Sequence, residues 1–329
     1  MENVRAVCIR APGGAEVLEL GEVACRDPGY GEVLVRVAAA GLNRADVMQR
    51  RGLYPAPPGE PRDVPGLEFA GIVARVGDGA GGFSPGDRVM GITGGGAMSE
   101  ALVAHHRMLM RVPEGMSLEE AAAIPEVFLT AWDALFGQAG GRLGEVALIH
   151  AAASGVGTAA VQLCRAAGVR SIGTARSAAK LGAVTALGLD DALVPEEGRF
   201  ADAVTSLTDG RGVDAILDPV GARYLADNLH ALAPLGRLVL IGLMGGATGE
   251  LPLSLVLMKR LRLMGTVLRS RPLEEKATLT QAFAREVLPL FARGALRPVI
   301  DVVLSMAEVR AAHERMERNG TVGKIVLRW

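Results

Sequence analysis

A glycine-rich turn between an apolar run and a helical stretch is the feature that most limits how this chain can fold. Residues 155–160 read Gly-Val-Gly-Thr-Ala-Ala, which matches the pattern GxGxxA. The apolar run Val146–His150 precedes them, and a helical pattern follows as far as Ala167. Glycines let a backbone approach a pyrophosphate closely, and a helix N-terminus favours its negative charge. The turn therefore predicts a dinucleotide site, with a glycine turn that binds nothing as the alternative.

The alternation of strand and helix continues through the middle of the chain. Further apolar runs predict strands at Arg170–Ala175, Val213–Leu217, Arg237–Ile241 and Arg262–Val267, with helical stretches between them. Such alternation is typical of an α/β fold with a parallel, doubly wound sheet. We assign residues 126–266 to this α/β domain.

The first 125 residues have a different pattern. Short Val- and Ile-rich runs such as Glu32–Ala38 and Ala70–Val76 are separated by Gly and Pro, which predicts short strands and tight turns. Tyr54–Pro65 holds five prolines and is expected to be a semi-rigid loop. The tail returns to a mixed pattern, with helical stretches at Leu273–Arg293 and Met306–Asn319 and strands near Val299–Leu304 and Lys324–Leu327. We therefore expect residues 1–125 and 267–329 to form one β-rich domain.

Composition excludes several classes of protein. The 35 basic and 36 acidic residues give a net charge of −1, so no basic field exists for nucleic acid or an anionic membrane. The three cysteines form no CxxC pair, which argues against a disulfide framework. The first residues lack the apolar core of a secretory signal, and no run approaches a membrane span. We expect a cytoplasmic protein.

The residues after the second predicted strand indicate which dinucleotide binds. An NAD site places an acidic residue about 20 positions after the glycine turn, but no Asp or Glu occurs from Gly157 to Leu189. Arg176, Ser177 and Lys180 stand there instead. Cations and a hydroxyl suit a 2′-phosphate, which a carboxylate would repel. The sequence predicts NADPH rather than NADH; the alternative is that both cations are solvated residues at a helix start.

Several motifs together resemble a known superfamily. GLEFAGIVARVG (66–77), SPGDRVMG (84–91) and GEVALIHAAASGVGTAAVQLCR (144–165) are similar to the medium-chain dehydrogenases/reductases. AGLNRADVMQRRGLYP (40–55) and AAAIPEVFLTAW (121–132) are similar to its zinc-independent quinone oxidoreductases, most closely the tumour-suppressor-inducible subgroup. The resemblance implies a GroES-like catalytic domain formed by the two ends of the chain, and a central Rossmann domain that binds NADPH.

The resemblance also allows a test for zinc. Zinc-dependent members of the superfamily begin their metal site with Cys where this chain has Asn43, and continue with Gly-His-Glu where it has Gly66-Leu67-Glu68. An amide and a leucine cannot replace a thiolate and an imidazole around Zn²⁺. No metal site is expected.

By similarity to the family, Asn43, Asp46 and Tyr54 would face the nicotinamide. Asn43 would donate a hydrogen bond to the acceptor carbonyl, Asp46 would orient loop backbone, and Tyr54 would stack on a flat ring or donate its hydroxyl. The alternatives are that Asn43 and Asp46 only cap a loop, and that Tyr54 is a surface residue.

The cofactor contacts predicted from the turn, the cations and the resemblance form a longer set. Within this set, Lys324 is expected to contact a phosphate. The alternative for Thr130 is an ordinary helix hydroxyl, and the alternative for Met244 is a residue that only fills the core. The set comprises Thr130, Ser154, Gly155, Val156, Gly157, Arg176, Ser177, Lys180, Val220, Gly221, Leu243, Met244, Gly245, Leu268, Arg269 and Lys324.

These predictions indicate an enzyme that needs no metal. The function expected first is reduction of a quinone by NADPH, because the cofactor supplies the hydride and aromatisation stabilises the product. Reduction of the C=C bond of a 2-alkenal or enone is the alternative within the same class, and a non-catalytic NADPH-binding protein is the alternative outside it. The resemblance implies a homodimer joined through the last Rossmann strand, Arg262–Val267.

Overall fold

The computed structural model describes residues 1–329. The chain divides into two compact units. Residues 1–129 and 268–329 form the first, here called the β-rich unit, and residues 130–267 form the second, the Rossmann unit. The limits expected from the sequence, at 125/126 and 266/267, lie four residues and one residue from these.

The Rossmann unit is built on six parallel strands in the order β10-β9-β8-β11-β12-β13. The chain starts in the middle of the sheet, extends to one edge and returns to build the other half, which is the doubly wound order of dinucleotide-binding folds. The predicted Rossmann domain is confirmed. The strands are β8 (Val146–Ile149), β9 (Arg170–Thr174), β10 (Asp191–Leu193), β11 (Val213–Asp218), β12 (Leu232–Leu240) and β13 (Arg262–Gly265).

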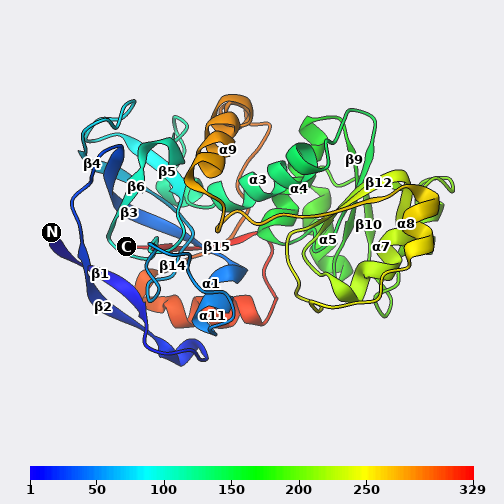
Figure 1. Ribbon diagram of the computed structural model, residues 1–329, viewed down its shortest axis with the longest axis horizontal. Helices are drawn as coiled ribbons and strands as arrows, with labels where there is room; N and C mark the ends of the chain where they lie inside the picture. The colour runs from blue at the N-terminus through cyan, green and yellow to red at the C-terminus, as the bar shows by residue number, and fades with distance from the viewer. The chain divides into compact units, whose positions relative to one another are not determined.

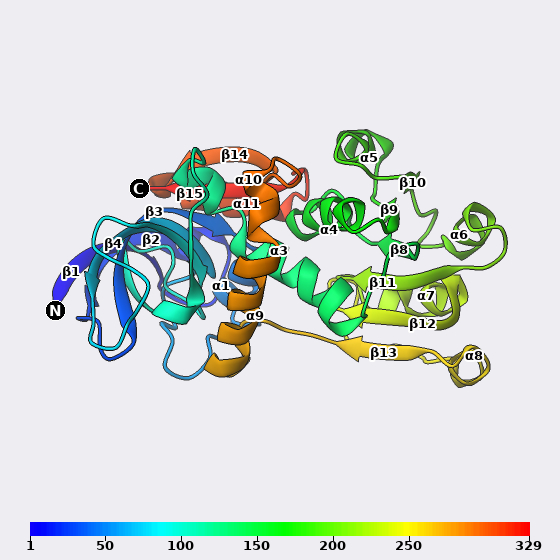
Figure 2. The same cartoon turned by 90° about the horizontal axis from the view of Figure 1, so that it is seen from above.

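Helices cover both faces of this sheet. Figure 2 shows α4 and α5 on one side and α6, α7 and α8 on the other. Leu148 pairs with Ile172 and Ile216 on the neighbouring strands, and all three side chains are buried in the core between the layers. The helices are α4 (Gly155–Ala166), α5 (Ala178–Thr185), α6 (Ala201–Leu207), α7 (Leu225–Ala231) and α8 (Leu253–Lys259), with a π-helix at η3 (Asp133–Gln138) and a 3₁₀ turn at η4 (Ala222–Tyr224).

The β-rich unit contains a seven-stranded sheet and a separate hairpin of β1 and β2. The last strand of the chain, β15, pairs with β3, where Ile325 lies opposite Leu42. Strands from the N-terminal part of the chain, β3 to β7, and from its C-terminal part, β14 and β15, therefore share one sheet (Figure 1). The strands are β1 (Glu2–Ile9), β2 (Leu18–Cys25), β3 (Glu32–Leu42), β4 (Glu68–Val76), β5 (Arg88–Ile92), β6 (Ala101–His105), β7 (Leu109–Arg111), β14 (Ile300–Ser305) and β15 (Lys324–Arg328).

Helices of the β-rich unit connect and cover these strands. The single helix predicted over Leu273–Arg293 is wrong, because Pro289 cannot donate a backbone hydrogen bond and clashes with the preceding turn. Two helices replace it. The elements are α1 (Arg44–Arg50), α2 (Leu118–Ala121), α9 (Leu273–Glu286), α10 (Leu288–Ala292), α11 (Val309–Glu317), η1 (Ala15–Val17), η2 (His106–Met108) and η5 (Met306–Glu308); α3 (Pro125–Trp132) crosses from this unit into the next. None of the helices has the length and apolar character needed to cross a membrane.

Candidate active site

The glycine-rich turn lies between β8 and α4, at the carboxyl end of a central strand. The Ser154 hydroxyl caps α4 by accepting the N–H of Gly157 at 3.1 Å. A Cβ atom on Gly157 would lie 2.4 Å from the carbonyl oxygen of Ala151, so only glycine fits there. Ser154, Gly155 and Val156 remain partly exposed. A closely packed backbone with an accessible helix N-terminus fits a pyrophosphate.

The predicted cations follow the neighbouring strand, β9. Arg176 and Ser177 are exposed, and Lys180 is partly exposed on the first turn of α5. Because β8 and β9 are adjacent and parallel, their carboxyl ends meet at one edge of the sheet. The positive side chains and the glycine-rich turn therefore lie at the same edge, as a phosphorylated dinucleotide requires.

Two further predicted segments follow β11 and β12 at that edge. The Asp218 carboxylate accepts the N–H of Val220 at 2.6 Å and of Gly221 at 3.1 Å. The N–H of Gly245 donates to the carbonyl of Val220 at 2.7 Å, which joins the two loops. The side chains of Leu243 and Met244 are 52% and 56% exposed. Met244 is therefore not a core filler, and the pair offers an apolar surface at the strand ends.

A series of buried, hydrogen-bonded polar side chains, which the predictions did not include, connects the strand ends at this edge. His150 Nδ1 lies 2.9 Å from the Thr174 hydroxyl, and its Nε2 lies 2.7 Å from Asn228 Oδ1. Asn228 Nδ2 donates to Asp218 at 2.9 Å. Burial lowers the pKa of His150 to about 4, so its imidazole is neutral at pH 7. These hydrogen bonds connect the ends of β8, β9 and β11. The sequence feature that could have predicted them is the polar residue His150 at the end of an apolar run.

In the β-rich unit, Asp46 fastens a helix to a loop. Its two carboxylate oxygens accept the N–H of Asn43 at 2.7 Å and of Gly66 at 2.8 Å. The side chain is fully buried, and this desolvation raises its pKa to about 6 despite those bonds. The geometry gives Asp46 the loop-orienting role and no surface with which to contact a substrate.

Asn43 and Lys324 belong to one buried network around Glu68. Asn43 Nδ2 donates to Glu68 Oε1 at 3.0 Å and to the Gly41 carbonyl at 3.2 Å. Lys324 Nζ donates to Asn43 Oδ1 at 2.7 Å and to the Leu42 carbonyl at 2.8 Å, and lies 2.5 Å from Glu68 Oε1.

This network corrects two predicted roles. The three ammonium hydrogens of Lys324 are taken by protein acceptors, and the side chain is 3% exposed, so it is not placed to bind a cofactor phosphate. Both amide hydrogens of Asn43 are likewise engaged, which leaves none for an acceptor carbonyl. Glu68, the centre of the network, lies in the quoted GLEF motif but is not among the predicted site residues.

Arg269 holds Tyr54 rather than offering its side chain to a cofactor. Its guanidinium donates to the Gly94 carbonyl at 2.7 Å, the Tyr54 carbonyl at 3.0 Å and Gln49 Oε1 at 2.5 Å. It also lies 5.1 Å from the centre of the Tyr54 ring, in a cation–π contact. Arg269 and Leu268 are 4% and 7% exposed. Their predicted cofactor contacts are not supported by the placement of these side chains, whereas Tyr54 is partly exposed and fixed in place.

Glu126 completes the group and was also missed. It lies on the first turn of α3, and its backbone N–H donates to Glu68 Oε2 at 2.8 Å. Its carboxyl retains some exposure. Burial, followed by the negative charge of Glu68, raises its pKa to about 8. An acidic residue inside the apolar motif AAAIPEVFLTAW was the signal. Thr130, one turn further along α3, is partly exposed.

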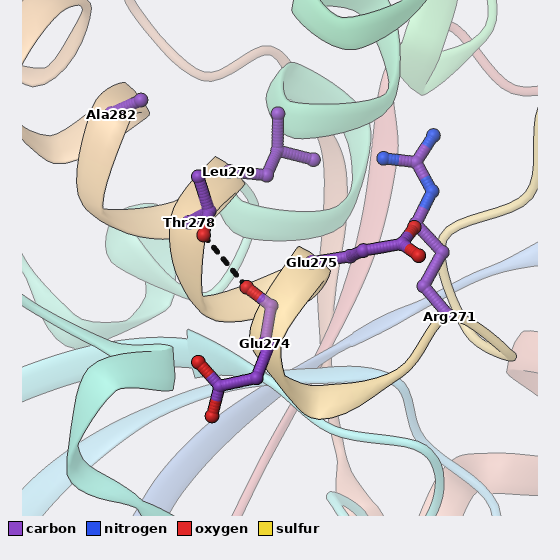
Figure 3. A pocket seen from close by; sticks show the side chains of 6 residues that line it. All are labelled: Arg271, Glu274, Glu275, Thr278, Leu279 and Ala282. Atoms are coloured by element: carbon purple, nitrogen blue, oxygen red, sulfur yellow. Dashed lines mark hydrogen bonds between the residues drawn. The ribbon is translucent and has the colours of Figure 1, made fainter.

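A depression beside α9 is not a candidate for the active site. Figure 3 shows the six side chains that line it: Arg271, Glu274, Glu275, Thr278, Leu279 and Ala282. The Thr278 hydroxyl donates to the Glu274 carbonyl at 2.8 Å, and the Glu274 carboxylate is held by Arg107 at 2.6 and 2.7 Å. The depression is open and contains no predicted site residue. No cluster of three or more His, Cys, Asp and Glu side chains is arranged to hold a metal ion.

Comparisons with known proteins agree with this architecture. The family model "Alcohol dehydrogenase GroES-like domain" matches residues 29–114, and "Zinc-binding dehydrogenase" matches residues 155–285. A quinone oxidoreductase of Pseudomonas aeruginosa is 36% identical over 322 residues, which cover 96% of this chain and 97% of that protein. A mycobacterial protein solved in complex with NADPH has a TM-score of 0.88 at 30% identity, covering 99% of this chain and 100% of that one. CurK enoyl reductase has a TM-score of 0.86 at 30% identity, with 100% and 99% covered.

A Rossmann domain with a phosphate-binding turn, carried on one chain with a GroES-like domain, defines an NAD(P)-binding oxidoreductase of the medium-chain dehydrogenase/reductase superfamily. Within that superfamily the chain belongs to the quinone oxidoreductase-like family.

Proposed function

We propose that this protein is an NADPH-dependent quinone reductase that uses no metal. The observation that carries the choice of cofactor is the pair Arg176 and Ser177, exposed at the sheet edge that also bears the glycine-rich turn. The similarity to a quinone oxidoreductase over nearly the whole of both chains supports the choice of acceptor. The nicotinamide supplies a hydride when it is bound.

The protein's own residues bind and orient the reactants in this proposal. Ser154, Gly155, Val156 and Gly157 hold the pyrophosphate, and Arg176, Ser177 and Lys180 hold the 2′-phosphate. Leu243 and Met244 offer an exposed apolar surface to a flat ring. Tyr54, fixed by Arg269, stacks on the acceptor. A quinone accepts a hydride readily because its product is aromatic, so a Lewis acid is not required. The positive charge that pairs with the Glu68 carboxylate is supplied by the ammonium group of Lys324.

Reduction of the C=C bond of an enone is the second candidate. The match to CurK enoyl reductase over the whole chain supports it. This reaction places a negative charge on carbon or oxygen of the substrate without forming an aromatic ring, so it depends more strongly on a proton donor.

The deciding experiment measures NADPH consumption with a 1,2-quinone, a 1,4-quinone and a 2-alkenal in parallel, each with and without prior chelation. We expect faster turnover with a quinone, less than one zinc per chain by elemental analysis, and no effect of the chelator. Faster turnover with the alkenal would favour the second candidate. No turnover with any acceptor would indicate a non-catalytic NADPH-binding protein, and zinc lost together with activity would contradict the proposal.

We also propose a homodimer formed through β13. This strand is the last in its sheet, and an open edge is usually covered or paired in soluble proteins. Leu253, Leu257 and Met258 on the preceding helix α8 are 69–79% exposed, which leaves an apolar surface beside the edge. Light scattering at micromolar concentration is expected to give twice the chain mass; a single chain mass would contradict the dimer.

A further inference from the structure

The carboxyl groups of Glu68 and Glu126 have very different surroundings although one backbone hydrogen bond joins the two residues. Glu68 accepts from Lys324 at 2.5 Å, from Asn43 at 3.0 Å and from the N–H of Glu126 at 2.8 Å. No protein group hydrogen-bonds to the carboxyl of Glu126. Glu68 also takes the N–H of the first turn of α3, which would otherwise favour a negative charge on Glu126. Of the two carboxyls, Glu68 is therefore the one whose oxygens are met by a cation and by hydrogen-bond donors.

The charges around Glu126 point the same way. Asp46 and Glu68 are the carboxylates that face it, from α1 and β4, while Lys324 on β15 and Arg269 are the cations. Lys324 is committed to Glu68, and the Arg269 guanidinium donates to three neutral acceptors. Two cations balance two carboxylates, and a third negative charge would be in excess. Two interacting carboxyls whose surroundings differ this much take different roles, one ionised and one protonated.

Tyr54 shares this surrounding. Burial raises the pKa of Tyr54, a negative charge on Glu126 would raise it further, and Arg269 lowers it. A general acid works best when its pKa lies near the working pH. At neutral pH the Tyr54 hydroxyl is a far weaker acid than a carboxyl whose pKa is about 8.

We propose that Glu126 is the proton donor of this enzyme, and that Glu68 is the positioning residue that keeps the proton on Glu126. The role rests on the proposed function. With an enone, the cofactor when bound would supply the hydride: a C–H bond of its nicotinamide would break, a new C–H bond would form at the β-carbon, and the C=C π electrons would move toward the carbonyl oxygen. The O–H bond of Glu126 would then break, the returning electron pair would form the C–H bond at the α-carbon with that proton, and the carboxylate would take up a proton from the solvent. With a quinone the same proton goes to an oxygen and gives the hydroquinone.

The first test is kinetic and uses Glu126→Gln, which keeps the size of the side chain but removes the acidic proton. We expect kcat with a 2-alkenal to fall about 10²-fold or more, the usual scale of general acid catalysis, and kcat with a 1,4-quinone to fall much less. Glu126→Asp should restore part of the loss. Glu114→Gln, at an exposed glutamate of the same unit, is the matched control and should leave kcat unchanged. NADPH affinity, followed by fluorescence, should be the same in all variants.

The second test follows the proton itself. With a 2-alkenal as acceptor, the wild-type kcat should be constant below pH 8 and fall tenfold per pH unit above it, because the donor must be protonated. This decline should be absent in Glu126→Gln. In Glu68→Gln it should move to lower pH, because a negative charge beside Glu126 is removed. Infrared spectra at pH 7 should show the carbonyl stretch of a neutral carboxylic acid that falls to about one tenth by pH 9 and is missing in Glu126→Gln.

The outcomes separate the two claims. A wild-type protein that reduces neither class of acceptor contradicts the proposed function. An active wild type whose rate, pH profile and infrared band are unchanged in Glu126→Gln overturns the donor role and leaves the function standing. An unmoved decline in a folded Glu68→Gln variant overturns the positioning role.

Discussion

The two units bury their polar groups in different ways. In the Rossmann unit, Thr174, His150 and Asn228 form a chain of neutral groups that ends at Asp218, whose charge is met by two backbone N–H groups. The β-rich unit instead buries an ion pair, Lys324 with Glu68, and holds Asp46 and Arg269 nearby. One unit is supported by hydrogen bonds between neutral groups and the other by paired charge.

The difference shows which predicted residues remain available to a ligand. The neutral chain of the Rossmann unit lies behind the sheet edge, so Arg176, Ser177 and Leu243 stay exposed in front of it. In the β-rich unit the predicted residues Asn43 and Lys324 are themselves the buried support, and their donors are used within the protein. A residue in a family motif is a candidate for binding only when its side chain is exposed.

The largest effect is expected where a buried charge loses its partner. Lys324→Met leaves Glu68, which is fully buried, without its cation. Removing one partner of a buried ion pair costs about 3–5 kcal/mol. Urea denaturation should show this loss in the β-rich unit, monitored by Trp329 in a Trp132→Phe background. The chain has two tryptophans, one in each unit.

An exposed ion pair of the same unit is the control for that variant. Arg107→Gln breaks the two-bond contact with Glu274, whose side chain is 73% exposed, and should cost about 1 kcal/mol or less. Adding Glu68→Gln to Lys324→Met should recover part of the loss, because no charge is then stranded. Equal effects of Lys324→Met and Arg107→Gln would show that the buried ion pair stabilises the β-rich unit no more than an exposed pair does.

The Rossmann unit is tested through its exposed cations. Replacing Arg176 and Lys180 together by Ala should weaken NADPH binding by about 2–4 kcal/mol, since hydrogen bonds to charged groups are worth about 1.5–3 kcal/mol each and overlap in part. NADH binding should barely change. Arg199→Ala, an exposed cation of the same unit, should affect neither. Fluorescence titrations with both cofactors give the comparison, and equal losses for NADPH and NADH would contradict a role at the 2′-phosphate.

Much of the fold followed from local patterns in the sequence. The buried strands β8, β9 and β11 follow their apolar runs to within a residue, because parallel strands covered on both faces need little else. The short helix α1 was not predicted. Its seven residues include Asp46, Gln49 and Arg50, which are buried by contacts with distant segments, so no apolar face marks it.

Only those parts of the site whose residues lie close together in the sequence could be predicted. The glycine-rich turn lies within one strand–turn–helix unit, and the exposed cations follow the next strand. The network of the β-rich unit joins Asn43 to Lys324, 281 residues away, and Gln49 to Arg269, 220 residues away. These residues lie in the family motifs, but only the tertiary structure shows that their hydrogen-bond donors are already paired with acceptors of the protein. Glu126 was missed because its character comes from Glu68, 58 residues earlier in the chain.

The neutral chain of the Rossmann unit predicts a dependence of stability on acid. His150 has a pKa of about 4 in the folded protein and about 6.5 when unfolded, so the unfolded state binds more protons between these values. Stability conferred by this residue is present at pH 8 and is lost as the pH falls. Between pH 8 and 4.5 the loss amounts to about 2–3 kcal/mol. His150→Gln should remove it, measured by Trp132 fluorescence in a Trp329→Phe background. His230→Gln, exposed in the same unit, should keep it.

The smallest effect concerns Tyr54, which is held by Arg269 yet partly exposed. Tyr54→Phe keeps the ring and removes the hydroxyl, whereas Tyr54→Ala removes both. If the ring contacts the acceptor, Ala should lower kcat/KM for a quinone by about 1–2 kcal/mol, the scale of an aromatic contact, while Phe keeps most of it. Because Glu126 supplies the proton, Phe should also keep most of the activity with an enone. A loss of about 10²-fold with the enone in Tyr54→Phe would instead make Tyr54 the donor. Unchanged kinetics in Tyr54→Ala would show that Tyr54 does not contact the acceptor. NADPH affinity, measured alongside, should be the same in both variants, which separates an effect on the acceptor from one on the cofactor.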